Sequence, residues 1–313
     1  MAPTSRRVKV SSALILGIAL IWLVVLAYCP EDFSDFDTAS RAAKGEYLTL
    51  DPGKTRYQVY GEAGRPTLVL IHSFNGYLES WTPNIDPLVA AGYRVVVYDL
   101  WGRGFSSRPD IDLSLPVFRA QLNAVIEQVD APQVDLVGAS FGAVIAADYL
   151  QHHPTRVNKL VLVGPAGWPQ DDDKTGLMLN LPLLGDLAFH YFGRSLLKPV
   201  VEAYFYDQGS NQWAVDEWEK FASYPGFTRA ALSTLRHAPV RDYSEGWQRL
   251  ADIDKPVLFV WGKQDVSFPY TNIEKVNNWI PSAQVVAVEA AAHWVNIEKA
   301  EQVNNAIISF LTP

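Results

Sequence analysis

Cysteine is nearly absent from this chain of 313 residues, which contains Cys29 alone. A disulfide bond within the chain is therefore excluded, and cysteine usage gives no indication of the redox compartment. The spacings of histidine and cysteine that bind zinc or an iron–sulfur cluster are also absent, so we expect neither a metal nor another cofactor. The sequence contains no internal repeat and no low-complexity tract, and it therefore does not indicate a repeat architecture.

Positively charged residues are few as well, with 26 lysine and arginine residues against 34 aspartate and glutamate residues and a net charge of −8. This balance, without an extended basic cluster, argues against a nucleic-acid partner. Charged residues make up 19% of the chain and hydrophobic residues 49%. A chain of this length and composition can bury a sizeable core in one large domain or two small ones.

The N-terminal segment is the exception to this mixed composition, because the run from Ala13 to Tyr28 is apolar apart from Gly17. Crossing a bilayer takes about 20 apolar residues, and the run is just long enough when it is counted from Val8. Basic residues precede it and acidic residues follow it. By the positive-inside tendency we expect residues 1–30 to form a transmembrane anchor, with the N-terminus in the cytoplasm and the remainder exported.

Two other interpretations of this segment remain open. The run could be a signal peptide with Val25-Leu26-Ala27 as the cleavage site, which would give a secreted protein. It could also end in a lipoprotein acylation site at Cys29, although Tyr28 is bulky for the residue before such a cysteine. The anchor is favoured because the run is long for the apolar region of a signal peptide. Residues 31–45 are polar and acidic, and we expect them to be a linker.

Short runs of β-branched and other apolar residues recur along the rest of the chain. We expect strands over residues 47–50, 56–60, 67–71, 93–98, 134–137, 159–163, 257–261 and 284–288. Helix-like segments lie between most of these runs, for example over 116–129 and 270–279. The alternation predicts an α/β fold with a mostly parallel, eight-stranded sheet that has helices on both faces.

Residues 168–252 break this alternation. They are rich in aromatic residues and leucine, contain no convincing central strand and resemble several short helices. We expect most of these aromatic side chains to pack the segment onto the core, and some of them to line a ligand pocket, because such pockets are mainly apolar.

The stretch Gly138-Ala139-Ser140-Phe141-Gly142 is the most informative part of the sequence. It follows the strand expected over 134–137 and precedes a helix-like run over 143–150. A serine at such a turn is held on a strained backbone with its hydroxyl exposed. The flanking glycines let the strand and the helix approach closely, and glycine tolerates the unusual dihedrals of the turn. The pattern therefore predicts that Ser140 is a nucleophile.

A nucleophilic serine needs a base, and the base needs an acid that orients it. Asp265 stands in a loop after the strand expected over 257–261, and His293 follows the strand expected over 284–288. No acid lies in residues 164–168, after the preceding strand, which favours Asp265. We expect His293 to remove the proton of the serine, and Asp265 to hold the imidazole in the required tautomer.

These motifs resemble those of the α/β-hydrolase family from about Glu46 to the C-terminus. Besides the serine turn, the likeness is carried by the segments His72-Ser73-Phe74-Asn75-Gly76, Asp99 to Ser106, Trp261 to Asp265 and His293 to Glu298. Ser73 departs from the pattern, because the family usually has glycine there. The resemblance implies an oxyanion hole made by the backbone N–H groups of Phe74 and Phe141. It also implies a core of residues 46–167 and 253–313 and a helical cap of residues 168–252.

A serine nucleophile in this family implies hydrolysis of carboxylic esters through an acyl-enzyme. Short matches over 163–167 and 261–265 are similar to membrane-tethered monoacylglycerol lipases and esterases, so we expect lipid-like or medium-chain acyl esters as substrates and the membrane as a partner of the N-terminal helix. A carbon–carbon bond hydrolase of aromatic degradation is the second interpretation, because His293-Trp294 resembles that group. A catalytically inactive binding module is the third, and it predicts a broken triad.

Overall fold

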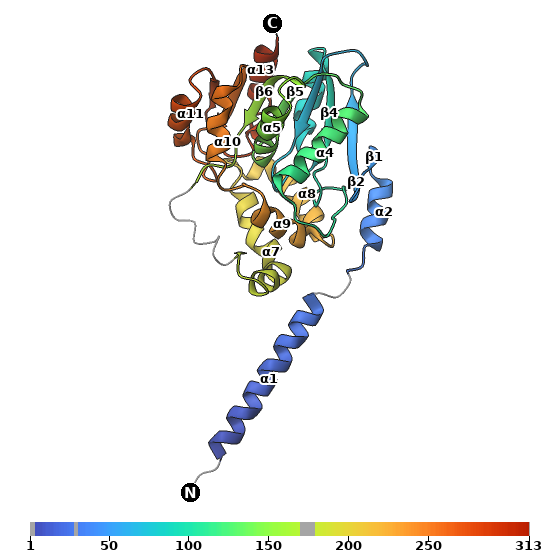
Figure 1. The fold of residues 1–313 in the computed structure, drawn as a ribbon, viewed down its shortest axis with the longest axis vertical. Coiled ribbons are helices and arrows are strands. Elements are labelled where there is room, and N and C mark those ends of the chain that lie inside the picture. The colour runs from blue at the N-terminus through green and yellow to red at the C-terminus, as the bar shows by residue number, and fades with distance from the viewer. Residues whose placement is uncertain (1–3, 28–30, 170–178, 313) are drawn as a thin grey trace.

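The computed structural model describes residues 4–27, 31–169 and 179–312, and its centre is a twisted sheet covered by helices (Figure 1). The sheet has eight strands in the order β1-β2-β4-β3-β5-β6-β7-β8. Their bounds are β1 Glu46–Thr49, β2 Lys54–Tyr60, β3 Thr67–Ile71, β4 Arg94–Tyr98, β5 Val134–Ala139, β6 Val157–Val163, β7 Val257–Gly262 and β8 Gln284–Val288. β2 runs antiparallel to both β1 and β4, and all other neighbouring strands are parallel. The predicted fold class is confirmed.

The helices follow the alternation expected from the sequence. Their bounds are α1 Thr4–Ala27, α2 Ser34–Ala42, α3 Thr82–Ala90, α4 Leu115–Gln128, α5 Phe141–His152, α7 Leu184–Glu202, α8 Gln212–Ser223, α9 Phe227–His237, α10 Ser244–Arg249, α11 Ile273–Trp279, α12 Val295–Glu298 and α13 Ala300–Leu311. Single 3-10 turns lie at η1 Leu78–Trp81, η2 Gly209–Asn211, η3 Leu250–Asp252 and η4 Tyr270–Asn272.

Two hydrophobic clusters fill the space between the sheet and the helices. Successive side chains of a strand point to opposite faces, and accordingly Val69 and Ile71 of β3 join the cluster that contains α4 and α5. Leu68 and Leu70 of the same strand join the cluster that contains α3 and α13. All residues of β3 are buried. Strands buried on both faces are typical of a parallel sheet, and they explain the continuous apolar runs in the sequence.

Helices α7, α8, α9 and α10 lie between β6 and β7 in the sequence, and α7, α8 and α9 lie beneath the sheet in Figure 1, whereas α10 packs against α5 and α11. Helix α7 packs against α8 and α9. Residues 170–178 of the expected cap lie outside the described residues. No strand is found over residues 179–252, as the loss of alternation in the sequence suggested.

Residues 31–45, which we expected to be a linker, include the helix α2. Phe36 of this helix is only 7% exposed, and its ring lies 6.0 Å from that of Phe105 and 5.5 Å from that of Tyr224. The guanidinium of Arg108 lies 4.3 Å from the centroid of the same ring. Phe36 is thus the buried residue of this polar, acidic segment, and the hydroxyl of Tyr47 adds a hydrogen bond of 2.8 Å to the carbonyl oxygen of Ser40.

The prediction of a transmembrane anchor with an exported domain is wrong. None of the helices in the described part of the chain is long and apolar enough to cross a membrane. The described run of exposed apolar residues in α1 extends from Leu14 to Leu26. Cys29, the alternative acylation site, lies outside the described residues.

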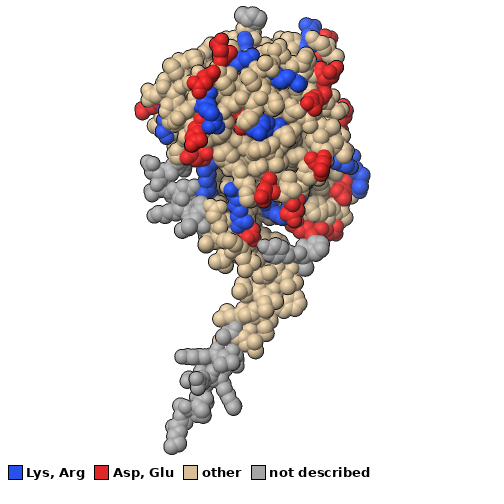
Figure 2. All heavy atoms as spheres, viewed as in Figure 1, with Lys and Arg blue, Asp and Glu red and all other residues tan. Residues whose placement is uncertain are grey.

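Helix α1 projects away from the sheet (Figure 1) and meets the remainder of the structure at α7. The hydroxyl of Tyr191 donates a hydrogen bond of 2.9 Å to the carbonyl oxygen of Leu23. Figure 2 shows acidic and basic side chains intermixed over the visible face of the domain, whereas residues 14–26 of α1 carry neither kind.

Candidate active site

Ser140 lies at the sharp turn between β5 and α5, where its backbone has φ 54° and ψ −115°. Residues other than glycine rarely adopt a positive φ, and such backbone strain is typical of functional sites. The two flanking glycines are required sterically. A Cβ at Gly138 would lie 2.3 Å from the carbonyl oxygen of Gly142, and a Cβ at Gly142 would lie 2.3 Å from that of Ile71. Any larger residue would push the helix away from the strands.

The structure brings Ser140, His293 and Asp265 together in one hydrogen-bonded chain. His293 Nε2 lies 2.8 Å from Ser140 Oγ, and His293 Nδ1 lies 2.7 Å from Asp265 Oδ2. The three residues are only 4%, 2% and 4% exposed, respectively. This geometry fits a neutral imidazole that donates from Nδ1 to the carboxylate and accepts the hydroxyl proton at Nε2.

The second oxygen of Asp265 is held by the backbone of its own loop. Asp265 Oδ1 accepts hydrogen bonds from the N–H groups of Ser267 at 2.8 Å and Phe268 at 2.9 Å. These two backbone hydrogen bonds therefore fix the orientation of the carboxylate toward the imidazole. Two aromatic rings enclose that imidazole, with centroids 4.8 Å away for Tyr204 and 5.6 Å away for Phe268.

Glu298 holds the histidine loop from the other side. Its Oε2 accepts a hydrogen bond of 2.8 Å from the N–H of Ala292, and its Oε1 accepts one of 2.6 Å from the N–H of Asp207. The glycine at 164 allows the loop to approach the sheet, since a Cβ on Gly164 would lie 2.7 Å from the carbonyl oxygen of His293. Contacts with the backbone thus position the imidazole.

The backbone amides of Phe74 and Phe141 follow the ends of β3 at Ile71 and of β5 at Ala139, respectively. Phe141 is the first residue of α5, so its N–H has no acceptor within the helix, and the helix dipole favours an anion there. Phe74 lines the same cavity as Ser140. Arg103 holds the peptide of Phe74 by donating a hydrogen bond of 2.5 Å from Nε to its carbonyl oxygen.

His72 supports the loop that carries Phe74, and it does not reach Ser140 through any described hydrogen bond. Its Nδ1 lies 2.8 Å from the carbonyl oxygen of Ser73, and its Nε2 accepts a hydrogen bond of 2.9 Å from the N–H of Leu100. Burial lowers the pKa of His72 to about 3. A neutral imidazole that donates on one side and accepts on the other therefore joins two loops.

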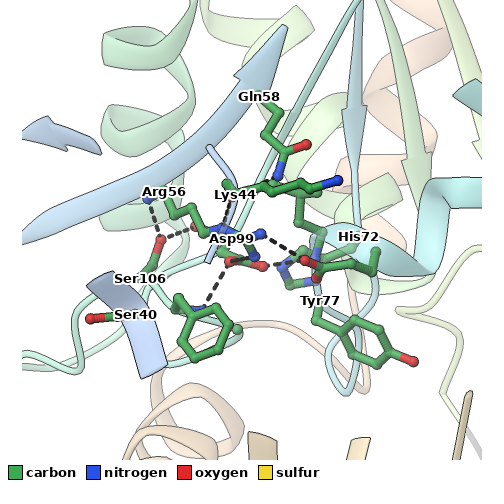
Figure 3. A network of polar contacts seen from close by, with 12 residues as sticks. Ser40, Lys44, Arg56, Gln58, His72, Tyr77, Asp99 and Ser106 are labelled. Atoms are coloured by element: carbon green, nitrogen blue, oxygen red, sulfur yellow. Dashed lines mark hydrogen bonds and ion pairs between the residues drawn. The ribbon is translucent and has the colours of Figure 1, made fainter. Parts of the chain in front are cut away.

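Asp99 organises the neighbouring loop (Figure 3). Its Oδ1 accepts a hydrogen bond of 2.7 Å from the N–H of Leu78, and its Oδ2 accepts one of 2.9 Å from the N–H of Phe105. The guanidinium of Arg56 lies 3.2 Å from the same Oδ2, and the hydroxyl of Ser106 donates to the Asp99 carbonyl oxygen at 2.7 Å. These contacts hold the loop over 99–106 together.

Ser73, the departure from the family pattern, has a partner that sequence reasoning missed. Its hydroxyl accepts a hydrogen bond of 2.8 Å from the indole Nε1 of Trp294. The backbone N–H of Trp294 donates one of 3.0 Å to the carbonyl oxygen of Tyr204. Trp294 directly follows His293, so the backbone and side chain of one residue join the histidine loop, the loop of the expected oxyanion hole and the segment after α7.

A cavity of about 650 Å³ opens at Ser140. Helix α7 and the residues after it supply much of its wall, and the aromatic residues Trp168, Phe189 and Tyr204 lie among the lining side chains. Most of the lining is apolar, with Leu196, Leu197, Val200, Leu235 and Val240 among the aliphatic residues. The sequence predicted aromatic residues in this wall. It did not predict the aliphatic residues, which reach the cavity because α7 places several of them on one side.

Comparison with known proteins identifies the family of this fold. Residues 66–300 match the model of the alpha/beta hydrolase fold family. The chain is 32% identical over 266 residues to the dihydrolipoyllysine-residue acetyltransferase component of the acetoin cleaving system of Cupriavidus necator, covering 84% of this chain and 68% of that protein. It is 26% identical over 290 residues to a 2-hydroxy-6-oxononadienedioate/2-hydroxy-6-oxononatrienedioate hydrolase of Cupriavidus pinatubonensis, covering 87% of this chain and 96% of that protein.

A hydrolase from Pseudomonas aeruginosa has a similar solved structure, with a TM-score of 0.71 at 21% identity over 87% of this chain and 100% of that chain. Since the family match covers most of the chain and includes the turn at Ser140 and the histidine loop, the chain belongs to the family of the alpha/beta hydrolase fold.

Proposed function

We propose that this hydrolase cleaves carboxylic esters and that Ser140 is its nucleophile. The observation that carries the proposal is the unbroken chain of hydrogen bonds from Ser140 Oγ through His293 to Asp265, with distances of 2.8 and 2.7 Å. An inactive binding module on the same scaffold would not need this buried, oriented triad. Residues 46–167 and 253–313 form the core in this proposal, and residues 168–252 form the cap.

The chemistry follows from the geometry. Ser140 Oγ attacks the ester carbonyl while His293 Nε2 takes its proton, and Asp265 stabilises the resulting imidazolium. The N–H groups of Phe74 and Phe141 stabilise the negative oxygen of the tetrahedral intermediate, for which one donor contributes about 3 kcal/mol in comparable enzymes. The imidazolium then protonates the departing alcohol, and the acyl group stays on Ser140. Water, deprotonated by the same imidazole, releases the acid and restores the serine.

The cavity indicates the class of ester. Its volume of about 650 Å³ and its mainly apolar wall suit an acyl chain better than a compact polar group. The likeness of the sequence to monoacylglycerol lipases and esterases supports the same choice. We therefore assign medium-chain acyl esters or monoacylglycerols as the substrate class. A panel of p-nitrophenyl esters from acetate to dodecanoate tests it, because kcat/KM is expected to rise from acetate to the medium chains. Turnover of acetate alone would contradict the assignment.

Carbon–carbon bond hydrolysis is the second candidate, because the relative from Cupriavidus pinatubonensis is named for a 2-hydroxy-6-oxo substrate and the chain shares the His-Trp pair typical of that group. In this chain Trp294 is only 1% exposed and its indole N–H is already bonded to Ser73. This tryptophan therefore has a structural role here, and we favour ester hydrolysis over carbon–carbon bond hydrolysis. The ultraviolet absorbance of a 2-hydroxy-6-oxo-hexadienoate gives an assay that separates the two candidate functions. If the protein turned over this compound faster than any ester, carbon–carbon bond hydrolysis would replace ester hydrolysis as the proposed function.

A further inference from the structure

A second cavity, of about 490 Å³, lies next to the one that contains Ser140. Its wall comes from the loop over 110–112, from α9 and from the N-terminal part of α7. Among the described residues, Phe189 is the one side chain that lines both cavities. The ring of Phe189 therefore forms part of the partition between the catalytic cavity and its neighbour.

Helix α7 sets the direction of the catalytic cavity. Phe189, Leu196 and Val200 of α7 line it, as does Ala203 directly after the helix, and their spacing of seven, four and three places them on one face. Ala203 precedes Tyr204, whose ring lies 4.8 Å from that of His293. Fourteen positions at about 1.5 Å each place Phe189 about 21 Å further along the helix axis. Phe189 thus stands at the end of the cavity away from the reacting bond.

Phe189 has little room to move. It is only 3% exposed, and its ring lies over the position of Gly193 one turn further along α7. A Cβ at Gly193 would lie 3.0 Å from Cδ1 of Phe189 and 3.0 Å from Cγ2 of Thr228 on α9. The ring of Phe189 therefore occupies the space beside Gly193, between α7 and α9. This packing fixes the position of the ring.

Much of the charge that lines the second cavity is paired, although Glu31 also lines it and Asp112 has, among the described residues, only His237 beside it, at 3.2 Å. Arg229 pairs with Asp110 at 2.8 Å, and Arg236 pairs with Asp186 at 2.6 Å. Leu232, only 4% exposed, lies in its wall. A chain end that passed the position of Phe189 would therefore enter a space that is partly apolar and empty of protein atoms.

We propose that Phe189 ends the acyl-binding cavity and sets the longest acyl chain that the enzyme accepts. The inference rests on the proposed ester hydrolysis at Ser140. Removal of the ring joins the two cavities, so that longer linear acyl chains can lie along α7 and continue past residue 189. Enlargement of the ring shortens the cavity and shifts the preference to shorter chains.

The test compares kcat/KM of the wild type, Phe189→Ala, Phe189→Leu and Phe189→Trp on p-nitrophenyl esters from acetate to hexadecanoate. Phe189→Ala is expected to move the optimum to longer chains, with a gain of about fourfold for each methylene group newly buried. Phe189→Leu should show a smaller shift in the same direction, and Phe189→Trp a shift to shorter chains. Phe192→Ala is the matched control, because Phe192 is on the same helix, is 61% exposed and lines neither cavity.

Reaction with a fluorophosphonate separates failure of this inference from failure of the proposed function. If the folded wild type neither reacts nor cleaves any ester, the proposed function is wrong, and the inference falls with it. If the wild type and the variants react but share one chain-length profile, Phe189 does not end the cavity. Phe189→Leu and Phe189→Trp keep the residue large and apolar, so they decide the matter even if Phe189→Ala does not fold. Opposite shifts in these two variants support the inference.

Discussion

The indole N–H of Trp294 donates a hydrogen bond of 2.8 Å to the hydroxyl of Ser73, although 221 positions separate the two residues. Both side chains are buried, at 1% and 4% exposed. The bond joins the loop that carries His293 to the loop that carries the N–H of Phe74. The proposed base and one proposed oxyanion donor are therefore held in register by a contact that involves neither of them.

Removal of the Ser73 hydroxyl tests this coupling. Ser73→Ala leaves the buried indole N–H of Trp294 without an acceptor, which is expected to reduce the free energy of unfolding by about 1–3 kcal/mol. We also expect kcat to fall more than KM rises, because the change misplaces groups that act in the transition state. Chemical denaturation and ester kinetics measure the two effects. Trp294→Phe removes the donor instead, and the double variant should lose less than the sum of the single changes. Additive losses would show that the two loops are not coupled.

Asp265→Asn tests the orientation of the imidazole. The carboxamide can no longer stabilise the imidazolium or enforce the tautomer with a proton on Nδ1, and kcat is expected to fall by about 10⁴-fold, as in serine proteases. Steady-state ester hydrolysis measures the loss. Glu289→Gln is a suitable control, since Glu289 lies in the loop before His293, is 69% exposed and pairs with Lys263. A fall of less than tenfold for Asp265→Asn would remove Asp265 from the proposed triad.

The buried His72 makes stability depend on pH. Burial lowers its pKa in the folded protein to about 3, whereas an unfolded histidine has a pKa near 6.5. Between these values the unfolded chain binds more protons than the folded protein. The contribution of His72 to the free energy of unfolding is therefore complete above about pH 6.5. It is lost as the pH decreases, by up to about 1.4 kcal/mol per pH unit. His72→Gln retains a donor and an acceptor but does not titrate. Urea denaturation from pH 7 to 4 should therefore show a shallower pH dependence for this variant, and equal slopes would contradict the assignment.

Gly142→Ala tests the close approach of α5 to β3. The new methyl group would lie 2.3 Å from the carbonyl oxygen of Ile71 and 2.6 Å from that of His72, and the overlap is expected to reduce the free energy of unfolding by about 3 kcal/mol. Gly209→Ala is the matched control, since its methyl group would meet only Asp207 Oδ1 at 3.6 Å. Thermal unfolding of both variants measures the difference. Equal stability would mean that the turn can relax without cost.

The sheet could be predicted from the sequence because parallel strands are buried on both faces and read as continuous apolar runs. The strand β5 shows a limit of this reasoning. We expected it over 134–137, but it continues through Gly138 and Ala139, since glycine at 138 is required by the packing of α5 and does not mark the end of the strand. Residues 270–279, expected as one helix, divide into η4 and α11.

The candidate site was indicated by local motifs, whereas its supports depend on long-range contacts. Ser140 and His293 stand in recognisable turns, and the assignment of their roles stays a prediction until it is measured. The partner of Ser73 left no signal except that a serine stood where glycine is usual. The helix α2 was missed because its segment is short and acidic and Phe36 is the one buried residue over Ser34–Ala42. The apolar N-terminal run suggested a membrane anchor, but none of the helices among the described residues is both long and apolar enough to span a membrane.

Covalent labelling of Ser140 tests the central claim most directly. The folded protein is incubated with a fluorophosphonate, and the labelled peptide is identified by mass spectrometry, with Ser140→Ala treated in parallel. We predict one adduct per chain, located on Ser140, and no adduct on the variant. Absence of labelling in the folded wild type, or equal labelling of Ser140→Ala, would contradict the proposal that this serine is an activated nucleophile.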